Sequence, residues 1–165
     1  MKPLRTPTFL RAMVAALALL LAGCDDGVNL PRSLTGSWLT VAVNPGGSRL
    51  EDRLELTSDG RYVWTTVTFA RAGRTQDGML AWFSRSGDWR VEGDRLALRT
   101  FSGMAWEHGR GWSQLDYTGG WDRGHRLRRL GERLVLDELL PPEMSRAPRT
   151  YTFDRVEGAL DTPRP

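Results

Sequence analysis

The sequence predicts an all-β protein, folded as an antiparallel up-and-down β-barrel or strongly curved meander of about eight to nine strands. Runs rich in β-branched and aromatic residues recur along the chain, and turn signals built on glycine, asparagine and aspartate separate them. The only helix-like spacing joins Leu127, Leu130 and Leu134, and Gly131 interrupts it. Short turns between successive strands favour a meander, and closing it into a barrel removes exposed strand edges. A β-sandwich is the alternative.

The N-terminal half alternates between β-prone runs and tight turns. A first strand is predicted over residues 36–43, and it ends at Asn44-Pro45-Gly46-Gly47, a strong cluster of breaking residues. Leu54 and Leu56 alternate with charged residues on a second strand, and Ser58-Asp59-Gly60 predicts a hairpin. The segments predicted after it are a strand over residues 62–69, a polar loop over 71–78, a strand from Met79 to Val91 with a bend or bulge at Ser86-Gly87, a turn at Gly93-Asp94 and a strand over 96–101.

Glycine-containing segments separate the predicted strands of the C-terminal half. Residues 103–111 are glycine-rich and are predicted to form a loop that carries Trp106, Glu107 and His108. The segments predicted after it are a strand over residues 112–117, a break over 119–124, a hairpin of residues 126–130 and 134–136 around Gly131-Glu132, and a last strand over 150–153.

The N-terminus has the layout of a secretory signal. Lys2, Arg5 and Arg11 form a basic start, and residues 12–22 form an apolar run before small residues. This run is about half the roughly 20 residues that a membrane-spanning helix needs. We therefore expect a removed signal and no permanent span.

Leu21-Ala22-Gly23-Cys24 ends the apolar run and contains the single cysteine of the chain. These four residues resemble the lipobox of bacterial lipoproteins. The resemblance implies cleavage after Gly23 and attachment of a lipid to Cys24. The alternative is an ordinary signal peptide that happens to contain a cysteine. A chain with one cysteine forms no internal disulfide, so the core must be aliphatic and aromatic.

Removing the signal changes the charge balance. The chain has 23 basic and 20 acidic side chains, and the three basic residues of the signal leave 20 of each sign. The pI near 9.6 therefore belongs to the precursor and does not indicate affinity for nucleic acid. We expect no nucleic-acid partner.

The predicted organisation is a signal peptide over residues 1–23, a lipid-anchored tether over 24–33, one β domain over 34–157 and a flexible tail over 158–165. The expected location is the cell membrane, with the domain facing the periplasm. Asp25 follows the cysteine directly, and an aspartate there resembles the enterobacterial signal for retention in the inner membrane. The inner membrane is therefore slightly favoured over the outer.

Leu34-Thr35-Gly36-Ser37-Trp38 resembles the Gly-x-Trp signature that opens the first strand of lipocalins and lipocalin-like bacterial proteins. Residues 56–62 and 87–96 resemble hairpins of the same domains. The resemblance implies that Trp38 plugs the closed end of the barrel and that the open end takes an apolar ligand.

Four aromatic side chains are the candidate ligand contacts: Tyr62, Trp64, Trp82 and Phe83. Strand alternation places Tyr62 and Trp64 on one face and Val63, Val67 and Phe69 on the other. Both faces are apolar, so the pattern does not decide which face is inside.

We find no motif for catalysis, a cofactor or a metal. Glu107 and His108 are sequence neighbours, and neither Ser102 nor Ser113 lies in a Gly-x-Ser-x-Gly motif. His108 and His125 lack zinc-site spacing. The arginines between Arg123 and Arg133 predict either a surface for lipid phosphates or an acidic partner, or a solvated hairpin face.

The predicted function is therefore not enzymatic. We expect a membrane-anchored envelope lipoprotein whose lipocalin-like barrel binds a small apolar or amphipathic ligand. The alternative is a structural or interaction lipoprotein, with a filled barrel that contacts another envelope protein. Interior volume distinguishes the two, because a ligand needs an empty cavity of a few hundred Å³.

Overall fold

The computed structural model describes residues 32–71, 78–118 and 120–157, which form nine strands and no helix. The all-β prediction is confirmed. Gly23, Cys24, most of the predicted tether and the tail lie outside the described residues. The strands are β1 (Gly36–Val43), β2 (Arg49–Leu56), β3 (Arg61–Phe69), β4 (Met79–Glu92), β5 (Arg95–Glu107), β6 (Gly111–Leu115), β7 (Trp121–Leu130), β8 (Arg133–Leu139) and β9 (Thr150–Val156).

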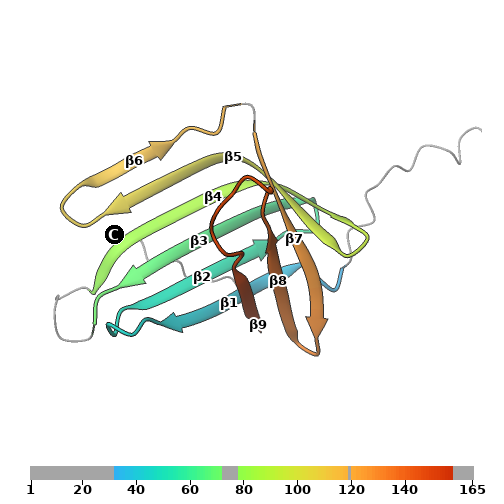
Figure 1. The fold of residues 1–165 in the computed structure, drawn as a ribbon, viewed down its shortest axis with the longest axis horizontal. Coiled ribbons are helices and arrows are strands. Elements are labelled where there is room, and N and C mark those ends of the chain that lie inside the picture. The colour runs from blue at the N-terminus through green and yellow to red at the C-terminus, as the bar shows by residue number, and fades with distance from the viewer. Residues whose placement is uncertain (1–31, 72–77, 119, 158–165) are drawn as a thin grey trace, which may run out of the picture.

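Eight of the strands close into an antiparallel barrel. The order is β4-β3-β2-β1-β9-β8-β7-β5, and β5 pairs back with β4. β6 lies outside this circuit and pairs with the C-terminal half of β5 (Figure 1). From β1 to β5 and from β7 to β9, each strand pairs with the strand that follows it in the sequence. The predicted up-and-down meander is therefore confirmed.

β4 and β5 form the longest hairpin, and a bulge bends it. Ser86 pairs with Ser102 and Gly87 pairs with Thr100, which leaves Phe101 as the extra residue. A Cβ atom on Gly87 would lie 1.8 Å from the carbonyl oxygen of Arg99. Only glycine fits there, because β5 approaches the backbone of β4 too closely for any side chain.

The predicted loop over residues 103–111 is wrong in its first half. Gly103 to Glu107 continue β5, and only the connection to Gly111 is a turn. Here β5 pairs with β4 on one side and β6 on the other. Two partner strands supply the backbone hydrogen bonds that outweigh the low strand propensity of glycine.

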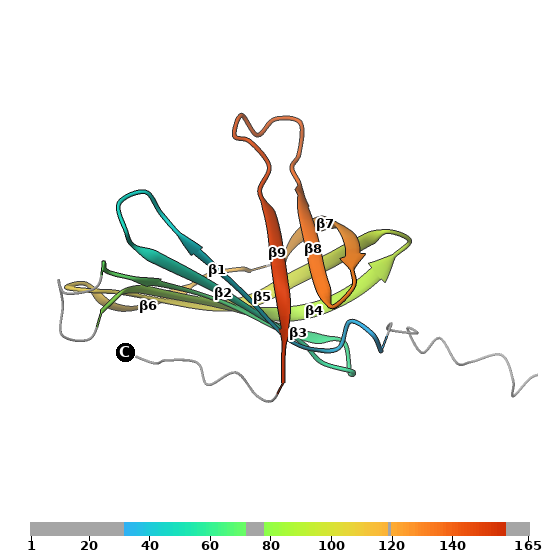
Figure 2. The same ribbon diagram turned by 90° about the horizontal axis from the view of Figure 1, so that it is seen from below.

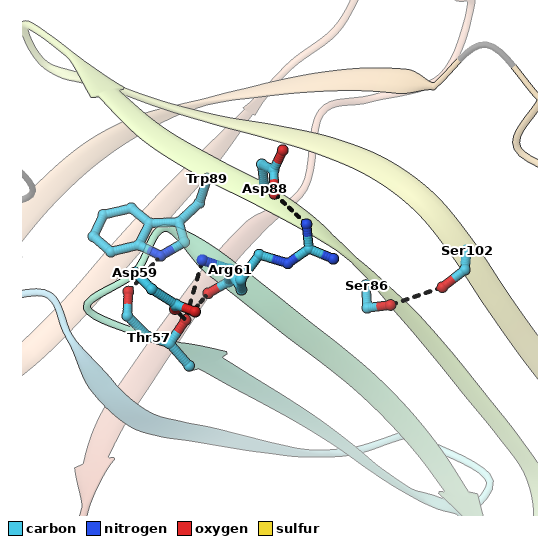
Figure 3. Close-up of polar contacts among 7 residues, drawn as sticks. All are labelled: Thr57, Asp59, Arg61, Ser86, Asp88, Trp89 and Ser102. Carbon is cyan, nitrogen blue, oxygen red and sulfur yellow. Dashed lines mark hydrogen bonds and ion pairs between the residues drawn. The ribbon is translucent and has the colours of Figure 1, made fainter. Parts of the chain in front are cut away.

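The Thr57–Arg61 turn joins β2 to β3 and is fastened to β4 (Figure 3). The indole nitrogen of Trp89 donates to the carbonyl oxygen of Thr57 at 3.0 Å, and Arg61 donates to Asp88 at 2.7 Å. Asp59 accepts a hydrogen bond from the Thr57 hydroxyl. The Ser86 and Ser102 hydroxyls, 2.8 Å apart, bridge β4 and β5 next to the bulge.

The packed core fills one end of the barrel. Trp38 is fully buried, and its indole nitrogen donates to the carbonyl oxygen of Leu34 at 3.0 Å. Burying both the ring and its N–H satisfies the two requirements of a core tryptophan. The other buried side chains of this cluster are Leu34, Leu54, Leu56, Tyr62, Trp64, Trp89, Leu96, Leu98, Leu134, Leu136 and Phe153.

The opposite end of the barrel is splayed. β1 pairs with β9 only from Ser37 to Leu39, although β1 continues beside β2 as far as Val43. β9 meanwhile stays paired with β8 from Thr150 onward. Figure 2 shows the β1–β2 and β8–β9 hairpins diverging from the point where they meet.

Candidate ligand-binding cavity

The residues that point into the barrel form the packed core at one end and line a cavity at the other. On β2, Leu54 and Leu56 are in the packed core, whereas Leu50 and Asp52 face a cavity at the splayed end. On β1, Trp38 is in the core and Thr40 faces the cavity. The same alternation that builds the core therefore also lines the open half of the barrel.

The cavity has a volume of about 900 Å³. Its described lining residues share an inward position or a place at the mouth: Thr40, Ala42, Asn44, Leu50, Asp52, Trp64, Thr66, Phe83, Arg85, Tyr117, Arg123, Arg149, Thr150 and Tyr151. Three of them are arginines and one is an acid, so the charges of the lining sum to a positive value. Aromatic and aliphatic side chains supply part of the remaining wall, and threonines and Asn44 supply the rest.

Trp64 is the floor of the cavity. Its ring is almost fully buried yet reaches the cavity, and it separates the open half from the core. Tyr151 and Phe153 meet it edge-on, with ring centroids 5.0 and 5.6 Å away. These contacts hold the indole in one orientation.

Asp52 is a buried carboxylate that is satisfied locally. Its Oδ1 accepts hydrogen bonds from the Trp64 indole nitrogen at 3.0 Å and from the Thr66 hydroxyl at 2.5 Å. These two bonds fix the floor of the cavity to the β2–β3 pair.

Arg85 lies opposite Trp64 in the β3–β4 register and is 7% exposed. Its guanidinium carbon lies 4.4 Å from the centre of the Trp64 ring. That geometry is a cation–π contact.

Glu138 is a buried carboxylate on β8 with two arginines beside it. Arg146 donates to both of its carboxylate oxygens, at 2.6 and 2.7 Å, and Arg123 lies 3.6 Å away. The Arg146 hydrogen bond is the main cause that holds the pKa of Glu138 below its ordinary value. Glu138 is therefore ionised and neutralises charge from β7 and from the segment after β8.

His125 lies beneath the cavity with no exposed surface, and its ring centroid is 5.6 Å from that of Trp64. Neither ring nitrogen has a hydrogen-bond partner among the described residues. Burial, and then the nearby charge of Arg85, lower the pKa of His125 from 6.5 to about 4. The imidazole is therefore neutral at pH 7.

The four predicted ligand contacts separate in the structure. Trp64 and Phe83 line the cavity. Tyr62 lies in the packed core, where its hydroxyl is 2.5 Å from that of Thr100. Trp82 faces the opposite side of β4, because adjacent strand residues point to opposite faces, and its ring meets Trp112 edge-on at 5.3 Å.

Sequence reasoning did not single out the polar residues of the cavity. Asp52 shares the face of Leu54, and Arg85 shares that of Phe83, so the alternation of β2 and β4 was an available signal. Tyr117 and Arg149 lie outside the strands, and no local pattern places them at the cavity.

The arginines after Trp121 do not form one surface. Arg123 points to the cavity, whereas Arg126, Arg128 and Arg133 are exposed. Arg128 pairs with Asp137 at 2.8 Å and Arg133 with Asp154 at 2.8 Å. This agrees with the solvated, ion-paired hairpin face.

The other residues considered for chemistry lie apart from the cavity. His108 is exposed in the β5–β6 turn, and its neighbour Glu107 pairs with Arg110 at 2.8 Å. Within residues 32–71, 78–118 and 120–157, no three His, Cys, Asp or Glu side chains are grouped to hold a metal. Those same residues contain no helix long and apolar enough to cross a membrane.

Comparison with known proteins gives no relative. No family model matches the chain, and no curated protein or solved structure matches it either.

Proposed function

We propose that this protein is a membrane-anchored lipoprotein of a bacterial envelope whose lipocalin-like barrel binds a small amphipathic ligand. The observation that carries the proposal is the cavity of about 900 Å³ at the splayed end. Cavities of roughly 300–1,000 Å³ with apolar walls and a few placed polar groups are typical of small-molecule sites.

The division of the barrel supports binding over a purely structural role. The half around Trp38 is filled by its own side chains, so it needs no ligand for stability. The other half leaves Leu50, Phe83 and Tyr151 lining an open space. Ligand burial against these side chains would remove apolar surface from water.

A retained ligand is the direct test. The protein is extracted from its own host in mild detergent and weighed by native mass spectrometry, then weighed again after denaturation. We expect an additional mass of a few hundred daltons in the native spectrum that is absent after denaturation. Identical masses in the two spectra would favour the alternative, an interaction protein that works without a ligand.

Attachment to the membrane rests on Leu21-Ala22-Gly23-Cys24. In the proposal, cleavage follows Gly23 and the lipid is carried by Cys24. Each buried CH₂ group of an acyl chain contributes about 0.8 kcal/mol to the free energy of membrane binding, so several chains together anchor a protein firmly. A mature chain with balanced charge has no strong electrostatic adhesion, so retention through a high-salt wash would reflect the lipid.

The Cys24→Ser variant tests the attachment. It should accumulate as a longer, unlipidated precursor, measured by intact-protein mass. Processing of the variant to the same size as the parent protein would show an ordinary secreted protein. In the proposal the domain faces the periplasm, and the inner membrane is slightly favoured because Asp25 follows the cysteine.

A further inference from the structure

The cavity contains a buried positive charge that the described part of the chain does not neutralise. Among residues 32–71, 78–118 and 120–157, none accepts a hydrogen bond from Arg85 or forms an ion pair with it. Its guanidinium contacts the Trp64 ring and lines the cavity. Buried arginines are normally paired, because removing the charge from water is costly.

The acids that could have paired with Arg85 already have donors. Asp52 accepts from Trp64 and Thr66, and Glu138 is held by Arg146 and Arg123. The third buried carboxylate, Glu51, pairs with Arg49 at 3.2 Å and Arg53 at 2.7 Å. Arg85 thus remains available to an anion that enters the cavity from outside.

The guanidinium is well suited to such an anion. Its planar group carries five N–H donors that match the geometry of carboxylates and phosphates. Arg85 combines the contact with the Trp64 ring with a place in the cavity lining. Arg149 lines the same space and increases its positive potential.

We propose that Arg85 binds the anionic head group, a carboxylate or a phosphate, of the amphipathic ligand, and this inference rests on the proposed binding function. On β4, Arg85 lies one inward position deeper than Phe83, away from the splayed end. The head therefore enters first, and the apolar chain lies along Phe83, Leu50 and Ala42 toward the opening.

The test compares probes that share a chain and differ in the head. Dodecanoate and dodecyl phosphate, each below its micelle concentration, 1-dodecanol below its solubility limit, and inorganic phosphate are titrated into the purified mature protein by calorimetry at pH 7.5. We expect the two anionic amphiphiles to bind roughly tenfold or more tightly than the alcohol. Inorganic phosphate should bind much more weakly, because it lacks the chain.

The decisive variant is Arg85→Gln, which should lower the affinity for both anions to that of 1-dodecanol and leave the alcohol unchanged. Arg90→Gln is the matched control, because Arg90 is an exposed arginine on the same strand with the same charge. Arg85→Lys keeps the charge without the planar fork and should retain part of the preference. Thermal unfolding checks that each variant is folded.

The outcomes separate the two proposals. Equal affinity for alcohol and anions in the parent protein, or an anion preference that survives in folded Arg85→Gln, overturns the role of Arg85 while ligand binding stands. Absence of binding by all four probes overturns both proposals. Inorganic phosphate binding as tightly as dodecyl phosphate supports the anion site and assigns it to a free anion instead of a lipid.

Discussion

At the scale of single residues, the barrel contains two buried side chains that differ in charge and that both contact Trp64. Arg85 is charged and faces the cavity, whereas His125 lies below it and is neutral. Trp64 contacts both and separates them from the packed core.

His125 makes the stability of the fold depend on pH. Its folded-state pKa of about 4 lies below the ordinary value of 6.5, so the unfolded chain takes up the proton first as the pH falls. The charges that act on it are Arg85, Arg123 and Arg95, which disfavour protonation, and Glu138, which favours it. The stability that neutral His125 contributes is thus present above pH 6.5 and is lost progressively as the pH falls from 6.5 to 4.

We predict that between pH 7 and pH 5 the free energy of unfolding of the parent protein falls by about 2 kcal/mol more than that of His125→Leu. Urea denaturation at a series of pH values measures the difference. His108→Leu, which changes an exposed histidine, is the control and should follow the parent protein. Parallel curves for the parent and His125→Leu would show that His125 does not titrate on unfolding.

At the scale of elements, the β4–β5 hairpin bends at the bulge, and β5 pairs with a different strand on each side of it. Below the bulge β5 pairs with β7, from Arg95 to Thr100. Above it β5 pairs with β6, from Gly103 to Glu107. The bulge therefore marks the level at which β5 leaves the closed circuit and carries the extra strand.

We predict that Gly87→Ala destabilises the protein by about 3 kcal/mol, because the new Cβ would meet the Arg99 carbonyl oxygen at 1.8 Å and the backbone must shift. Urea unfolding monitored by tryptophan fluorescence measures this. Gly46→Ala, at an open turn position where nothing lies within 4 Å, should change stability by less than about 0.5 kcal/mol. Equal effects of the two substitutions would contradict the close approach of β5 to β4.

At the scale of the whole molecule, the barrel is closed firmly at one end and loosely at the other. The β1–β9 seam spans only Ser37 to Leu39, and its continuation is splayed. The core cluster lies at the closed end, and the cavity lies at the splayed end. In the proposed function, a ligand would enter at the splayed end without disturbing the packing around Trp38.

The rates of amide hydrogen exchange should differ between the closed and the splayed end of the barrel. We predict that the seam-facing amides of Thr40 to Val43 exchange roughly tenfold or more faster than the amides of β8 around Leu136, which has strands on both sides. Exchange followed by NMR on the mature domain measures this residue by residue. Uniform protection along β1 would mean that the seam is closed over its full length.

The sequence by itself determined the local features of this protein. It indicated the all-β class, the meander and most turns, because turn residues and alternating side chains act over a few neighbouring positions. The strand over residues 36–43 matches β1 at both ends, since Asn44-Pro45-Gly46-Gly47 cannot continue a strand. Lipid attachment at Cys24 stays a prediction from the sequence, outside the described residues.

The tertiary structure alone decided which faces are inside and what they meet. Both faces of β3 are apolar, so only closure of the barrel placed Trp64 at the cavity, and the same closure put Trp82 outside and Phe83 within. Ion pairs such as Arg123 with Glu138 join positions on different strands. Whether Arg85 has a partner is likewise a property of the folded barrel, because pairing depends on distances that periodicity does not encode.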